Sequence, residues 1–72
     1  MVARLPRVTA RVVIRVLQTH GFREVRSSGS HRIFRNAAGV RTTVPFHAGK
    51  VLSPKLLKSI LKEAKLTPRD LH

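Results

Sequence analysis

The sequence predicts an α+β fold of the order α-β-β-β-α, in which two helices cover one face of a three-stranded antiparallel sheet. Apolar residues recur at helical spacing near the start and the end of the chain, and residues 22–45 between them change to short strand-like segments separated by turn residues. A length of 72 residues allows one domain, expected to span residues 1–72. Neither helix can bury its apolar stripe except on the sheet, so both are expected on the same face, with the other face open.

The first helix is predicted to begin after Thr9 and to end at Gly21. Thr9 is a suitable N-cap, and glycine is the usual residue just past a helix C-terminus. The predicted apolar stripe contains Val12, Val13, Val16 and Leu17. His20 is interpreted as a structural residue, because a partly charged imidazole is favourable at the C-terminal end of a helix.

Three antiparallel strands are predicted at residues 22–26, 31–35 and 40–44. Residues 27–30, Ser-Ser-Gly-Ser, form the first predicted turn, and residues 36–39, Asn-Ala-Ala-Gly, form the second. Helix, three strands and helix follow one another as in double-stranded-RNA-binding domains, although the order of elements does not by itself establish a topology.

The second helix is predicted to open at Ser53-Pro54, an N-cap followed by proline at the first helical position. Its predicted buried stripe is Leu56, Leu57, Ile60, Leu61 and Ala64. The remaining surface carries Lys55, Lys58, Lys62 and Lys65. These lysines are either an ordinary solvated face or a row that follows RNA phosphates, and the spacing does not decide between the two. Thr67-Pro68 resembles the start of another helix.

The charge balance predicts a polyanionic partner. The chain has 15 Lys and Arg residues against 3 Asp and Glu, a formal net charge of +12. Most of the cations are arginines, whose planar side chain suits bidentate phosphate recognition. A merely soluble surface is the alternative, but so one-sided a balance costs self-repulsion, so nucleic acid is favoured. Tyr and Trp are absent and the three Phe are expected in the core, so no aromatic side chain is available to stack on bases. The protein should therefore contact mainly the sugar-phosphate backbone of the RNA.

Pairing of Asn36 with Val40 across the second turn would set His31 opposite Pro45. Strand alternation then divides the side chains between the two faces. Those expected to point toward the helices are Phe34, Val40, Val44 and Phe46. Those expected on the open face are Arg26, His31, Arg35 and Arg41. The sequence therefore predicts a histidine surrounded by arginines.

Such an arrangement suits RNA cleavage, because a neutral imidazole can take the 2′-hydroxyl proton while cations stabilise charge developing on the phosphate. His47, just past the third strand, is expected near Gly29 and is a candidate second acid or base. Gly29 and Ser30 are candidate phosphate contacts. From spacing alone, however, a structural histidine at the entrance of a strand is the more frequent role of a residue placed like His31.

A metal site is not expected. Two-metal nuclease chemistry needs several convergent carboxylates, and the only acidic residues are Glu24, Glu63 and Asp70, in separate segments. The histidines at positions 20, 31, 47 and 72 show no close ligand spacing, and there is no cysteine. No apolar run is long enough to span a bilayer, and no signal-like segment follows Arg4 and Arg7, so a cytoplasmic location is expected.

Gly29-Ser30-His31 followed by Phe34 resembles the motif of the HicA toxin family, also called YcfA-like. The resemblance extends along nearly the whole chain, through these segments: Leu17 to Gly21-Phe22, the following strand with Arg26, Thr43-Val44-Pro45 with His47, and Leu57 to Ile60-Leu61. Lys55 and Lys65 stand where members of the family often have glycine, which leaves the motif untouched.

The resemblance implies the toxin of a type II toxin–antitoxin system, an mRNA interferase with a double-stranded-RNA-binding-like fold. No cofactor is expected. It implies that His31 is the catalytic residue and that a HicB-type antitoxin protein holds the toxin inactive. Two alternatives stay open: a non-catalytic RNA-binding module, and a degenerate toxin that acts mainly within an antitoxin complex, with DNA contacted only through that complex.

Overall fold

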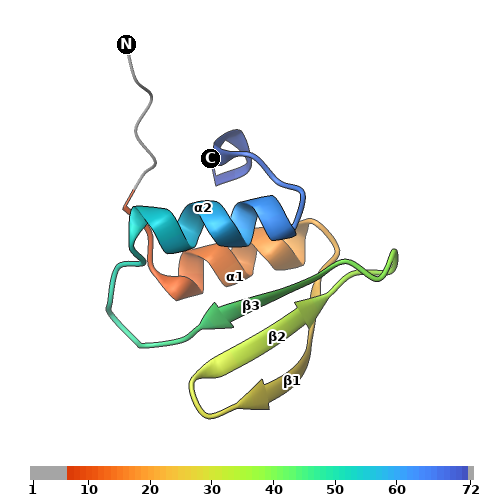
Figure 1. Ribbon diagram of the computed structural model, residues 1–72, viewed down its shortest axis with the longest axis horizontal. Coiled ribbons are helices and arrows are strands. Elements are labelled where there is room, and N and C mark those ends of the chain that lie inside the picture. The colour runs from red at the N-terminus through yellow and green to blue at the C-terminus, as the bar shows by residue number, and fades with distance from the viewer. Residues whose placement is uncertain (1–6, 72) are drawn as a thin grey trace.

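The computed structural model describes residues 7–71, so Arg4 and His72 lie outside the described part of the chain. Its elements are α1 (Ala10–Thr19), β1 (Arg23–Ser28), β2 (His31–Arg35), β3 (Arg41–Pro45), α2 (Pro54–Glu63) and a short 3-10 helix, η1 (Pro68–Leu71). The strands form an antiparallel sheet in the order β1-β2-β3, and both helices lie on one face of it (Figure 1). The predicted α+β fold and the single helical layer are confirmed.

Helix α1 is capped as predicted, but its buried stripe differs from the prediction. The Val12 N–H donates to the Thr9 hydroxyl at 3.4 Å, and Gly21, with a φ of +88°, turns the chain out of the helix. The buried residues are Ala10, Val13, Ile14 and Leu17. Val12 is 36% exposed and Val16 is half-buried, so the predicted stripe was wrong at these two positions. Apolar residues occupy most of this helix, so composition alone does not fix which face is buried.

Strand β1 runs to Ser28, two residues beyond its predicted end at Arg26, and begins at Arg23. A bulge at Val25, between the paired residues Glu24 and Arg26, absorbs one residue. Ser28 therefore pairs with His31, and the turn contains only Gly29 and Ser30. Gly29 has a φ of +57°, the left-handed geometry that two-residue hairpin turns need. The predicted four-residue turn at 27–30 was wrong because Ser27 and Ser28 continue the pairing of β1 with β2.

The pairing of β2 with β3 confirms the predicted register. Asn36 donates its N–H to the Val40 carbonyl at 3.0 Å, and its side-chain oxygen accepts from the Val40 N–H at 2.9 Å. His31 is then the Cα partner of Pro45. Phe34 and Val44 are fully buried under the helices, and Val40 and Phe46 pack at the margin of the core.

Helix α2 begins at its predicted N-cap, where the Ser53 hydroxyl accepts from the Leu56 N–H at 3.2 Å. The predicted stripe is buried, except that Leu56 is half-buried. The hydroxyl of Thr42, a buried residue of β3, donates to the Glu63 carboxylate at 2.9 Å and ties α2 to the sheet.

The short helix η1 begins at Pro68, directly after Thr67, where the sequence predicts a second capping segment. The Thr67 N–H donates to the Asp70 carboxylate at 2.7 Å, and Asp70 also lies 3.4 Å from the Nε2 atom of His20 at the end of α1. The hydrogen bond from the Thr67 backbone, with smaller contributions from the Thr67 hydroxyl and from His20, lowers the pKa of Asp70 below its ordinary value. No helix within residues 7–71 is long and apolar enough to cross a membrane.

Candidate functional site

The open face of the sheet carries three rows of side chains that cross all three strands. Because Phe34, Thr42 and Val44 are buried under the helices, their neighbours along each strand must face the other way. The rows are Ser28 with His31 and Pro45, then Arg26 with Ile33 and Thr43, and finally Arg23 with Arg35 and Arg41. The sequence-predicted residues Arg26, His31, Arg35 and Arg41 are thus on one face, and all four are exposed.

The last row places three arginines directly opposite one another on neighbouring strands, which lie about 5 Å apart. Like charges in this arrangement repel one another, so the row is suited to an anion that neutralises it. Arg23 was missed from sequence. Strict alternation puts residues 23 and 26 on opposite faces of a strand, and only the bulge at Val25 returns both to the open face.

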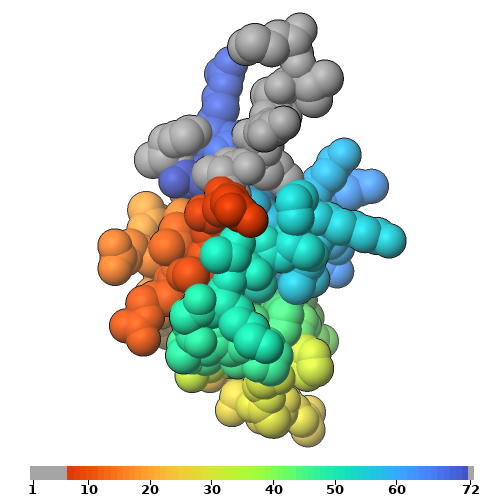
Figure 2. All heavy atoms as spheres, turned by 90° about the vertical axis from the view of Figure 1, so that its left-hand side faces the viewer, coloured from red at the N-terminus to blue at the C-terminus, as the bar shows by residue number. Residues whose placement is uncertain are grey.

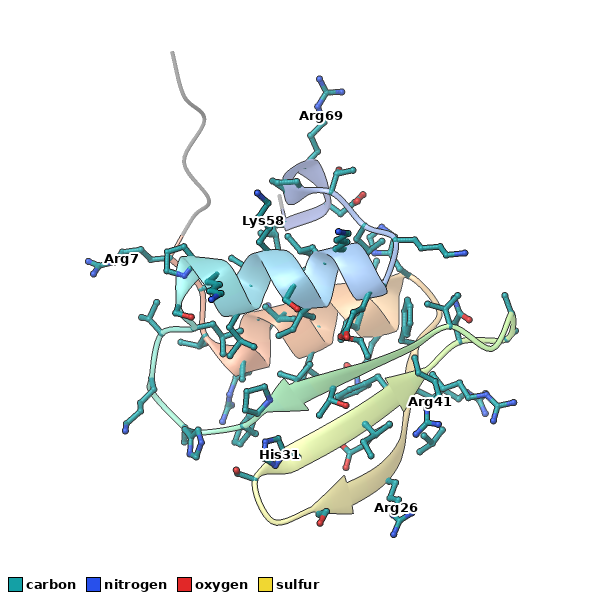
Figure 3. All side chains as sticks on the ribbon, viewed as in Figure 1. Arg7, Arg26, His31, Arg41, Lys58 and Arg69 are labelled. Carbon is teal, nitrogen blue, oxygen red and sulfur yellow. The ribbon has the colours of Figure 1, made fainter. Side chains whose placement is uncertain are left out.

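His31 stands at the opposite end of β2 from this arginine row. It follows the Gly29-Ser30 turn and lies four residues from Arg35, or about 13 Å along the strand. Figure 3 shows His31 at one end of the sheet and Arg26 and Arg41 toward the other. The prediction of a histidine surrounded by arginines was therefore wrong. The cations share its face, but Arg26 stands in the middle row and the other arginines stand at the far end, because residues on one face recur only every second position.

His47 lies at the same end of the sheet as His31. The strand ladder continues one step past β3, where the Phe46 N–H donates to the Ser30 carbonyl at 2.6 Å. The chain then turns, and His47 lines a groove together with Pro45, the strand partner of His31. Both histidines are exposed.

All three acidic side chains point away from the open face. Glu24 pairs across the sheet with Phe34, on the helix side, and lies 3.8 Å from Arg32. Glu63 accepts from Thr42 and Asp70 from Thr67, both on the helical layer. Arg32 is also on the helix side, with its guanidinium 4.1 Å from the centre of the Phe46 ring. The open face therefore carries no carboxylate, and its arginines lie in the middle row and in the row farthest from His31.

The described residues, 7–71, contain no group of three His, Asp or Glu side chains that could hold one metal ion. What the open face offers chemically is an exposed imidazole, a row of guanidinium groups, and the hydroxyls of Ser28 and Thr43, whereas Ser30 lies half-buried in the turn before His31. These groups can donate to phosphate oxygens, and the imidazole can exchange a proton.

A comparison with protein-family models gives a match to residues 10–66, and the matching family is described as the HicA toxin of bacterial toxin–antitoxin systems. The matched region runs from the start of α1 past the end of α2 and contains the whole open face. A search of curated proteins found no match. The family model covers well over half of the chain, and the chain therefore belongs to the HicA toxin family of bacterial toxin–antitoxin systems.

Proposed function

We propose that the protein is an endoribonuclease toxin that cleaves messenger RNA through His31, without a metal ion. The observation that carries the proposal is the exposed imidazole of His31 on a sheet face that holds four arginines and no carboxylate. RNA supplies both the phosphates that suit the arginines and the 2′-hydroxyl that an imidazole can deprotonate.

Binding and chemistry are assigned to opposite ends of the face. Arg23, Arg35 and Arg41 hold the RNA backbone, and Arg26 in the middle row holds it closer to His31. Because the arginine row lies about 13 Å from His31 along the strand, it contacts phosphates that flank the scissile one. The arginines therefore fix the position of the strand, and they act on affinity more than on the chemical step.

The chemical step is an attack within the RNA itself. His31 takes the proton of a 2′-hydroxyl, the 2′-oxygen bonds to the adjacent phosphorus, and the bond from phosphorus to the 5′-oxygen breaks. The products are a 2′,3′-cyclic phosphate and a 5′-hydroxyl, which takes up a proton. His47 is the candidate donor of that proton, since it lies at the same end of the sheet. The hydroxyl and backbone of the Gly29-Ser30 turn are candidate contacts of the reacting phosphate.

Regulation by an antitoxin follows from membership of the family, and we assign the antitoxin to the HicB type. An acidic protein that covers the open face would neutralise the arginines and block access to His31 together. Contact with DNA would then be made only through that complex.

The end groups of the cleaved RNA test the proposal. The chain is incubated in EDTA with an RNA and with its all-2′-deoxy counterpart, and fragments and termini are analysed. The proposal predicts salt-sensitive binding of both strands, cleavage of the RNA alone, and 2′,3′-cyclic phosphate or 3′-phosphate ends. Binding of both without cleavage of either would favour the non-catalytic RNA-binding module. Cleavage of the deoxy strand would contradict the 2′-hydroxyl mechanism.

A further inference from the structure

A groove of about 260 Å³ lies at the His31 end of the sheet, between the end of β3 and the start of α2. Its wall includes Pro45, His47, Lys50, Val51 and Leu56. Figure 2 looks onto this end of the molecule, where the segment between β3 and α2, coloured green to teal, faces the viewer. Pro45 connects the groove to the open face, because it is the strand partner of His31.

The groove is built on anchored backbone. At one end of the segment the Phe46 N–H donates to the Ser30 carbonyl, and at the other the Leu52 N–H donates to the Val8 carbonyl at 2.8 Å. Between them, the Lys50 N–H donates to the His47 carbonyl at 3.1 Å and closes a turn. The groove is thus held in shape by the sheet and by the entrance to α1, and a ligand would not have to order it.

The lining of the groove combines apolar side chains with basic ones. Pro45, Val51 and Leu56 give an apolar wall, and Val51 is 51% exposed, so the chain itself leaves this surface uncovered. His47 and Lys50 add an imidazole and an ammonium group, and no acidic residue lines the groove. Ligand pockets for drug-sized molecules measure roughly 300–1,000 Å³, so this smaller volume suits a single ring system.

We infer that the groove binds one nucleobase of the RNA substrate, next to the scissile phosphate. The inference rests on the proposed function. An RNA strand bound at His31 would also pass next to Pro45, the strand partner of His31, and would place one base at the groove. The base would pack on the apolar wall and the His47 ring, and Lys50 would pair with the phosphate of the same nucleotide. The chain lacks Tyr and Trp, but the groove would provide a surface that contacts a base. This contact would add to the contact with the RNA sugar-phosphate backbone that is expected from sequence.

Mononucleotides test the inference directly. The ¹⁵N-labelled chain is titrated with AMP, GMP, CMP and UMP, and with ribose 5-phosphate as the control that lacks a base. We expect saturable amide shifts in residues 47–53 with at least one nucleotide and no such shifts with ribose 5-phosphate. Equal shifts with ribose 5-phosphate would show a phosphate site only. Absence of saturable shifts would show that the groove does not bind nucleotides and would favour a protein partner there. Each of these two results overturns the inference.

Two valine substitutions give a matched pair of variants. Val51→Trp fills the groove, whereas Val12→Trp makes the same change at an exposed position of α1 that does not line it. Val51→Trp should abolish the nucleotide shifts and weaken RNA binding by about tenfold or more, while Val12→Trp changes neither. Similar loss in both variants, or in neither, contradicts the inference.

The outcome is separable from that of the proposed function. The titration measures binding of nucleotides that cannot be cleaved, so it does not depend on catalysis. Nucleotide binding in the groove of a chain that never cleaves RNA would contradict the nuclease proposal alone. Cleavage of RNA by a chain whose groove does not bind nucleotides would contradict the groove inference alone.

Discussion

His31 and Arg35 lie on the same face of β2 but at opposite ends of it, four residues and about 13 Å apart. Arg35 is flanked by Arg23 and Arg41 on the neighbouring strands, whereas His31 is flanked by Ser28 and Pro45. Under the proposed function, the arginine end of the face binds phosphates and the His31 end carries out the chemistry. Different experimental readouts should therefore respond to substitutions at the two ends.

Neutralising the arginine row should weaken RNA binding and leave the chemical step nearly unchanged. Under the proposed function, Arg35→Gln and Arg41→Gln each remove one phosphate contact, so the negative slope of log binding constant against log salt should become less steep by about 0.7 for each. In cleavage assays KM should rise while kcat changes little. Arg69→Gln is the control, because Arg69 lies beyond the helices, away from the sheet (Figure 3). A fall in kcat with unchanged KM would contradict the division of roles.

The hydrogen bond between Thr42 and Glu63 should contribute measurably to stability. Thr42→Val keeps the shape of this buried side chain but removes the donor, and should lower the free energy of unfolding by about 1 kcal/mol. Thr43→Val is the matched control, since Thr43 is the exposed neighbour on the open face. Urea denaturation measures both variants. Equal free energies of unfolding for Thr42→Val and Thr43→Val would mean that the hydrogen bond does not contribute to stability.

Gly29→Ala should destabilise the hairpin between β1 and β2. An added Cβ at Gly29 meets no atom within 4 Å, so the cost comes from the positive φ of +57° and should be about 1 kcal/mol. Ser28→Ala, one residue earlier in the regular part of β1, serves as the control. Thermal or urea unfolding gives the comparison, and an unchanged midpoint for Gly29→Ala would show that the turn accepts a side chain.

Asp70 should make the stability of the chain fall in acid. In the folded chain the Thr67 backbone N–H, then the Thr67 hydroxyl and His20, hold the pKa of Asp70 below its ordinary value. A carboxyl with a lowered folded pKa stabilises the fold above its unfolded pKa, and the stabilisation is lost as the pH falls through the folded pKa.

The free energy of unfolding of the wild type minus that of Asp70→Asn should therefore be largest above about pH 5 and shrink at lower pH. Urea denaturation at a series of pH values measures this difference. A difference that does not change with pH would contradict the role given to Asp70.

The fold and its register were predictable because local chemistry fixes them. The turn that contains Asn36 and Gly39 favours pairing of Asn36 with Val40. The pairing of His31 with Pro45 then follows from the register of the two strands. The bulge at Val25 was not predictable, because β1 is exposed along its whole length and has no burial pattern that would be broken by an extra residue. Arg23 was missed for the same reason.

The groove could not be derived from sequence either. Its wall comes from a segment without regular structure, shaped by hydrogen bonds to Ser30 and to Val8, which lie far from it in the chain. The sequence did indicate His47 as a candidate acid or base, but Lys50 and Val51 carry no recognisable pattern, and Leu56 was predicted only as part of the buried stripe of the second helix. Such sites become visible only when the backbone around them is known.

Cleavage of a long RNA in EDTA by His31→Ala, compared with His20→Ala, shows whether His31 is the catalytic residue. Both variants remove one exposed imidazole, but His20 lies at the end of α1, bonded to the Val16 carbonyl and close to Asp70. We expect that His31→Ala stays folded and binds RNA but does not cleave it, while His20→Ala cleaves as the wild type does. Cleavage by His31→Ala at the wild-type rate would show that His31 is not the catalytic residue.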